Sequence, residues 1–174
     1  MPTPIGHALA GVAAGWAATT PREDRPGLWT QAAIFAAVAA APDLDLLVHL
    51  HRGETHSLGA AVIVASVAAA LRWPVAGTRM RIWLAIFAAY TTHPLLDALA
   101  LDRAPPLGIM AFWPVSYAYV QSGAEVFAPV SRSWWVAGFY THNIAAAARE
   151  VAILTPVCLL VWWWRRKRGG PFYP

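Results

Sequence analysis

The sequence predicts an all-α membrane protein: a helical bundle of about five spans, formed as a single domain over residues 1–174. Hydrophobic residues make up 58% of the chain and charged residues 13%, whereas a soluble domain carries about 25% charged residues. The chain also has ten tryptophans and five tyrosines, and such rings collect at the headgroup level of a bilayer. Apolar segments recur at lengths close to the roughly 20 residues that one span needs.

Five apolar segments are candidates for these spans. The first is short and rich in alanine and glycine, so the sequence leaves open whether it crosses the membrane or lies on its surface. The last one stops at a run of basic residues. The segments cover residues 5–19, 28–48, 58–73, 82–101 and 144–164. The interval 102–142 is rich in proline and aromatic residues, and we expect short interfacial or re-entrant pieces there.

Lysine and arginine predict the orientation, because they are enriched on the cytoplasmic side of membrane proteins. If residues 165–168 are cytoplasmic and five spans alternate, the loops around residues 22–25 and 72–81 fall on the same side. Nine of the thirteen basic residues are then inside. All six histidines and seven of the nine acids fall toward the outer face. The sequence therefore predicts one polar site at the outer face, with the lipid bilayer as its surroundings.

Composition also argues against other classes of protein. The net charge of +4 comes from thinly spread basic residues, so no nucleic-acid partner is expected. The single cysteine, Cys158, can form neither a disulfide framework nor a cysteine-based zinc site.

The strongest local signal is His93-Pro94-Leu95-Leu96-Asp97. Residues four apart lie on one face of a helix, so His93 and Asp97 could offer two ligands to one metal. Both lie in an apolar segment, where ionisable groups are costly and usually functional. Pro94 predicts a kink that opens space beside them. The alternative is a buried His–Asp hydrogen bond that joins two helices.

Two other segments offer ligands on the same side. His7 lies at the outer end of the first apolar segment, where an interfacial histidine is the alternative. Asp43 and Asp45 follow a long alanine-rich run, and two positions apart they face different sides of a helix. We expect Asp45 to be the metal ligand of the pair. The alternative is a helix-capping role, for which aspartate is well suited.

Residues 51–57 form the densest polar cluster of the chain. It contains His51, Arg52, Glu54 and His56, and histidines with carboxylates suit borderline metals. The alternative is an ordinary hydrophilic loop. His142 and the Arg149-Glu150 pair could add one more ligand, or could be an interfacial arginine with its counter-ion. A mixed set of nitrogen and oxygen donors suits zinc, or manganese or iron.

The ordered motifs resemble a bacterial and archaeal family of inner-membrane-associated, metal-dependent hydrolases. They are Pro4-Ile5-Gly6-His7, Pro42-Asp43-Leu44-Asp45, residues 51–57, His93-Pro94-Leu95-Leu96-Asp97 and Phe112-Trp113-Pro114. The resemblance covers residues 3–115 through these motifs and the remainder by hydrophobic pattern. That family is distantly similar to zinc-dependent phospholipases C and single-strand nucleases. The resemblance implies metal-binding roles for His7, Asp45, His56, His93 and Asp97, with Asp43 and His51 as alternates.

The chain departs from those zinc enzymes at one motif. They have a further His-x-x-x-Glu pair, whereas the residue four after His142 is Ala146. One or two zinc ions are therefore expected, and a trinuclear site is not.

These observations lead to three hypotheses. The first is a membrane-embedded, metal-dependent hydrolase of a lipid or lipid-linked phosphoester at the outer face of the inner membrane. In it Arg52 binds the phosphate and Asp43 or Glu54 acts as the general base. The second is a non-catalytic metal-binding protein or transporter, although apolar inner halves of the spans argue against a path through the membrane. The third is a scaffold whose His–Asp pairs join helices.

Overall fold

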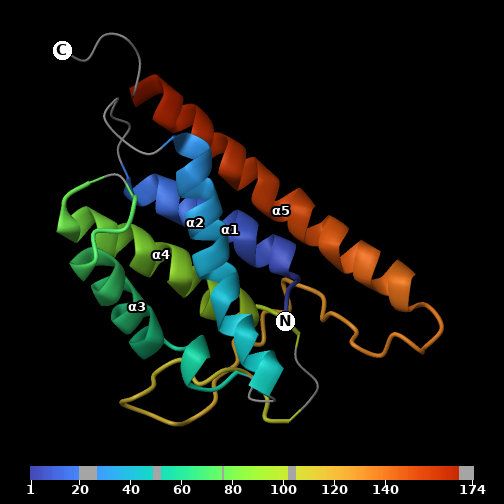
Figure 1. Ribbon diagram of the computed structural model, residues 1–174. Helices are drawn as coiled ribbons and strands as arrows, with labels where there is room; N and C mark the ends of the chain where they lie inside the picture. The colour runs from blue at the N-terminus through green and yellow to red at the C-terminus, as the bar shows by residue number, and fades with distance from the viewer. Residues whose placement is uncertain (20–26, 49–51, 76, 102–104, 169–174) are drawn as a thin grey trace.

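The computed structural model, shown in Figure 1, describes residues 1–19, 27–48, 52–75, 77–101 and 105–168. Within these ranges the regular structure is helical and no β-strand forms, so the predicted all-α class is confirmed. The elements are α1 (Pro4–Ala18), α2 (Leu28–Ala40), the 3-10 helices η1 (Ala41–Val48) and η2 (Glu54–His56), α3 (Leu58–Ala70), α4 (Arg79–Ala98) and α5 (Phe139–Arg168).

The number of helices that could cross a membrane is smaller than predicted. By length and composition, two stretches of the described chain qualify: residues 28–47, which join α2 to η1, and α5. Helices α1 and α3 have 15 and 13 residues, fewer than the roughly 20 that a crossing needs. Helix α4 has 20 residues, but Arg79, Arg81, His93 and Asp97 lower its hydropathy. The expectation of about five spans was too high because α1 and α3 are too short and α4 carries charged residues near both of its ends.

The helices alternate in direction along the bundle. Helices α1 and α3 begin at the end where α2 and α4 finish, near the loop of residues 105–138 (Figure 1). We call this the histidine end, because His7, His56 and His93 lie there. The opposite end carries Arg79 and Arg81 at the start of α4 and the basic run at the end of α5, and we call it the arginine end. The histidine cluster and the basic residues of α4 and α5 therefore lie at opposite ends of the bundle.

Helix α1 is the centre of the fold, with contacts to α2, α4 and α5. Its glycines allow α2 to approach closely. A Cβ atom at Gly11 would lie 2.3 Å from the Cβ of Ala39, and one at Gly15 would lie 2.3 Å from the Phe35 ring. Such small-residue contacts are typical of helices packed inside a membrane. The close packing brings the last turn of α2 next to α1 and α4.

Helix α5 differs from the others, because it buries only one narrow stripe. Its buried residues are Ala146, Glu150, Cys158 and Arg165. Exposed apolar and aromatic side chains cover the remaining faces: Tyr140, Ile144, Val151, Ile153, Val157, Leu159, Leu160, Trp163 and Trp164. At its last turn, Arg166, Lys167 and Arg168 each lie 4.0–4.3 Å from the ring centre of a tryptophan. A lipid-exposed helix with an aromatic and basic end explains this pattern.

Candidate metal centre

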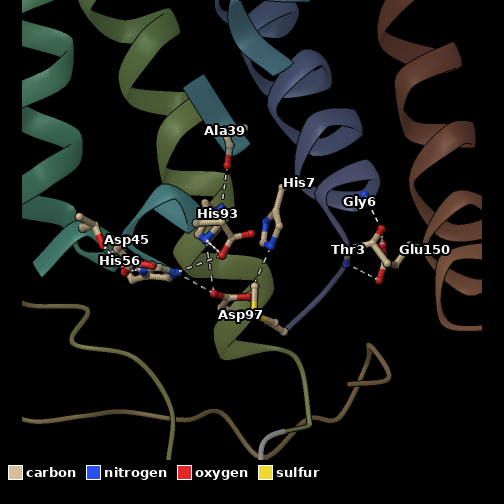
Figure 2. Close-up of polar contacts among 12 residues, drawn as sticks. Thr3, Gly6, His7, Ala39, Asp45, His56, His93, Asp97 and Glu150 are labelled. Carbon is tan, nitrogen blue, oxygen red and sulfur yellow. Dashed lines mark hydrogen bonds and ion pairs between the residues drawn. The ribbon is translucent and has the colours of Figure 1, made fainter. Parts of the chain in front are cut away.

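Four elements bring their polar residues together at the histidine end. His7 comes from the first turns of α1, Asp43 and Asp45 from η1, and His56 from η2. Helix α4 supplies His93 and Asp97 (Figure 2).

The geometry of α4 supports the expected His93–Asp97 pair, although the helix continues through Pro94 from Arg79 to Ala98. His93 Nδ1 donates to the carbonyl oxygen of Ala39, at 2.7 Å. Ala39 lies in the last turn of α2, where carbonyls lack a partner within their own helix. This hydrogen bond fixes the ring and directs Nε2 toward the cluster.

Donor atoms of five residues converge at nearly equal spacing. Asp97 Oδ2 lies 3.4 Å from Nε2 of both His93 and His56. Asp43 Oδ1 lies 3.6 Å from the same two nitrogens. His7 Nε2 lies 3.5 Å from Asp97 Oδ1. Hydrogen bonds are shorter than this, whereas donors that surround a zinc ion tetrahedrally at about 2.1 Å are about 3.4 Å apart. The spacing therefore fits a metal ion between the donors.

The cluster is buried, with side-chain exposures of 0% for His7, His56 and His93, 2% for Asp97 and 12% for Asp43. Within the described chain, both carboxylate oxygens of Asp97 and Asp43 and the Nε2 atoms of His7 and His93 have no hydrogen-bond partner. Buried polar atoms are normally satisfied, because desolvating them is costly. A bound cation would supply the missing partner.

Asp45 lies behind this cluster. Its Oδ2 is 3.2 Å from His56 Nδ1 and accepts a hydrogen bond of 2.7 Å from Thr55 Oγ1. Tyr90 in turn donates from its hydroxyl to the Thr55 carbonyl, at 2.7 Å. Histidine ligands usually donate their second ring nitrogen to a carboxylate in this way. Asp43 therefore lies among the other donors and Asp45 lies on the Nδ1 side of the His56 ring, a placement that favours Asp43 over the expected Asp45 as a ligand.

Comparison with known proteins decides the family of the chain. The family model of the YdjM inner membrane protein matches residues 1–169. The chain belongs to the YdjM family. No curated protein and no solved structure matches it. The family description agrees with the membrane and inner-membrane assignment, and the matched region includes the whole polar cluster.

The His56 imidazole of this YdjM-family protein is strongly basic. Burial alone would lower its pKa, but the nearby carboxylates of Asp43, Asp45 and Asp97 outweigh burial and raise the pKa to about 9. Three carboxylates around one ring cause the shift. Without a metal, His56 therefore carries a proton at neutral pH.

The other residues predicted from the sequence lie elsewhere. His51 is outside the described residues. Arg52 is half-buried, and its carbonyl oxygen accepts from the Met110 amide at 3.0 Å. Glu54 is exposed at the start of η2, and its carbonyl accepts from Ser57 Oγ. His142 is exposed and donates from Nε2 to the Pro129 carbonyl, at 2.7 Å.

Some contributors were missed by sequence reasoning. The carbonyl of Ala39 accepts from His93, the Thr55 hydroxyl donates to Asp45, and the Tyr90 hydroxyl donates to the Thr55 carbonyl, all from outside the cluster. A threonine beside a histidine is too common in sequences to indicate a functional role. The position of a backbone carbonyl leaves no pattern in the sequence at all. The packing of α2 on α4 reveals the contact of Ala39, and the approach of η2 to α4 reveals the contacts of Thr55 and Tyr90.

Proposed function

We propose that this YdjM-family protein is a metal-dependent hydrolase that cleaves phosphoesters at the outer face of the inner membrane. The observation that carries the proposal is the convergence of three imidazoles and two carboxylates, at 3.4–3.6 Å, inside a buried cluster. Structural His–Asp pairs would form hydrogen bonds of normal length instead.

The ion would be held by His7, Asp43, His56, His93 and Asp97. Both three-residue groups suited to a metal, His7–Asp43–His93 and His56–His93–Asp97, include His93. Since His93 Nδ1 is engaged by Ala39, only its Nε2 can bind a metal, and we infer a single shared ion. Imidazole with carboxylate ligands suits zinc.

The chemistry assigns tasks to the chain's own residues. A bound divalent cation would polarise a phosphoryl oxygen and make water more acidic. Asp43 has the most exposed side chain of the five residues, and its buried Oδ2 has no hydrogen-bond partner among the described residues. We assign to Oδ2 the removal of a proton from the attacking water. Arg52, on the loop before η2, would neutralise the phosphate. Glu54 remains the alternative base.

A lipid or lipid-linked substrate follows from the surroundings of the cluster. Exposed apolar side chains lie on η1 beside the aspartates, with Leu44 and Leu47 exposed at 63% and 78%. The loop of residues 105–138 adds Leu107, Phe112 and Val115. Such a surface would accommodate acyl or isoprenoid chains while the cluster binds the phosphate. Because the arginine end belongs in the cytoplasm, the histidine end faces outward.

The burial of the three imidazoles favours a second candidate, a closed metal site without turnover. Structural metal sites are closed, whereas catalytic ones keep an open position. In this second candidate function, the ion has a structural role and holds η1 and η2 against α1 and α4. The two candidates share the ion and differ in catalysis.

Metal analysis of the detergent-purified protein tests the proposal. We expect one equivalent of zinc in the wild type, its loss in His93→Ala, and its retention in His142→Ala, a matched control because His142 is an exposed histidine outside the cluster. The loaded protein should then hydrolyse p-nitrophenyl phosphodiesters or phospholipids. If the protein binds metal but hydrolyses none of these substrates, the second candidate, a closed structural site, is favoured. If it binds no metal even after supplementation, both candidates are wrong.

A further inference from the structure

We propose that Glu150 of α5 is a positioning residue for His7: it anchors the first turn of α1 and thereby places the imidazole in the metal centre. The inference rests on the proposed metal site. Glu150 itself does not contact the cluster, and Figure 2 shows it on the far side of α1 from Asp97.

The carboxylate of Glu150 binds the start of α1. The amide of Thr3 donates to Oε1 at 2.8 Å, and the Thr3 hydroxyl donates to Oε2. The amide of Gly6 donates to the Thr3 hydroxyl oxygen at 3.3 Å and lies close to the same carboxylate. Amides in the first turn of a helix have no partner within the helix, and a negative charge there is favourable. His7 directly follows Gly6, so the anchored backbone is the backbone that carries the ligand.

The surroundings show that this contact is specific. Glu150 is completely buried in a helix long and apolar enough to cross a membrane, where a carboxylate is costly and usually functional. A Cβ atom at Gly6 would lie 2.5 Å from Glu150 Oε2. The carboxylate can therefore reach the amides only because residue 6 is glycine. An apolar residue at position 150 would join the two helices at lower cost, but it would not fix the first turn of α1.

The other end of α1 provides a natural control. Arg165 is buried and donates from Nη1 to the carbonyls of Trp16 and Thr19, the latter at 2.8 Å, and to the Thr19 hydroxyl. Between the two ends, Cys158 Sγ donates to the Leu9 carbonyl at 3.0 Å. Helices α1 and α5 thus run parallel, with the negative charge at the start of α1 and the positive charge at its end. Trp16 lies about 14 Å along the axis from His7, so Arg165 attaches α1 without reaching the metal centre.

Cobalt titration tests the assignment, because the visible absorption of Co²⁺ reports its ligand geometry. We compare the wild type with Glu150→Ala, Glu150→Gln, Arg165→Met and Cys158→Ala in detergent. Glu150→Ala should weaken Co²⁺ binding at least tenfold and alter the spectrum, as loss of a ligand's support does. Glu150→Gln keeps one carbonyl acceptor, so its affinity for Co²⁺ should lie between that of Glu150→Ala and that of the wild type. Arg165→Met should lower Tm, whereas its affinity for Co²⁺ should stay within threefold of the wild type and its spectrum should be unchanged. Cys158→Ala should change neither the affinity for Co²⁺ nor the spectrum.

The outcomes separate the two proposals. If the wild type binds Co²⁺ and Glu150→Ala binds it equally with the same spectrum, Glu150 is only an attachment between helices and the inference is wrong. If Arg165→Met disturbs the spectrum as much as Glu150→Ala, the effect is general loosening, which also overturns it. If the wild type binds no Co²⁺, the proposed metal site itself fails. Should Glu150→Ala not fold, Thr3→Val removes one donor, and unchanged affinity in that variant would contradict the inference.

Discussion

Asp43 and Asp45 are two positions apart on η1, and they contact different parts of the cluster. In a 3-10 helix, successive residues are about 120° apart, so the two carboxylates leave the helix on different sides. Asp43 Oδ1 lies near Nε2 of His56 and His93, while Asp45 Oδ2 lies near Nδ1 of His56. The order of the two aspartates along η1 therefore places Asp43 beside Nε2 of His56 and His93, and Asp45 beside Nδ1 of His56.

Substitution of each aspartate by asparagine should separate these roles. Asp45→Asn should weaken zinc binding by about 10–100-fold without changing the stoichiometry, because it only disturbs the orientation of His56. Asp97→Asn should abolish binding, because it removes a donor. Competition against a zinc indicator measures both. Loss of stoichiometric zinc in Asp45→Asn would make Asp45 a ligand itself.

The basic His56 imidazole predicts that metal binding depends on pH. Its pKa of about 9 means that zinc must displace a proton throughout the neutral range. Apparent zinc affinity should therefore rise about tenfold per pH unit from pH 6.5 and level off near pH 9. Calorimetry in buffers of different ionisation enthalpy should detect the released proton. An affinity that is independent of pH would show that His56 is not a ligand.

At the scale of elements, the fold depends on how closely α1 approaches its neighbours. Gly15 lies against the fully buried Phe35 ring. Gly15→Ala should destabilise the protein by about 1–3 kcal/mol, because the ring must move within a packed core. Thermal unfolding in detergent measures the loss. Gly27→Ala is the matched control, since a Cβ there meets nothing within 4 Å. Equal Tm values for the two variants would contradict the close α1–α2 contact.

Helix α4 illustrates a different relation between an element and its sequence. Its polar residues make it a poor candidate for a membrane span although it is long enough. It nevertheless supplies His93 and Asp97 to the cluster and contacts α1, α2 and α3. The charges that lower its hydropathy lie near its two ends, with Arg79 and Arg81 at the start and Asp97 at the finish. Helix α4 therefore has its basic residues at the arginine end of the bundle and its acidic residue at the histidine end.

At the scale of the whole molecule, the separation between the histidine end and the arginine end predicts the orientation in the membrane. In a Cys158→Ala background, Ala118→Cys reports on the histidine end and Met80→Cys on the arginine end, and both positions are exposed. A membrane-impermeant thiol reagent added to intact spheroplasts should label the first strongly and the second only after lysis. The reverse pattern would place the proposed site in the cytoplasm.

Features that depend on neighbours along the chain could be predicted from the sequence. Five apolar runs predicted the five α-helices of the described chain, with two exceptions. Helix α2 ends at Ala40 and is followed by η1, whereas the run continues to residue 48, and α5 begins earlier than its run, at Phe139. The spacing of His93 and Asp97 predicted that they share a face of α4, because four residues make about one helical turn.

Only the tertiary structure decided which distant groups meet. It turned Asp43 inward and Asp45 behind His56, joined His93 to the Ala39 carbonyl, and placed Glu150 at the first turn of α1 instead of in the cluster. It also reduced the stretches long and apolar enough to cross a membrane to two among the described residues. The reason is physical: periodicity and hydropathy are properties of a segment, whereas a ligand's support, a buried carboxylate's partner and a helix's true ends depend on segments far away in the chain.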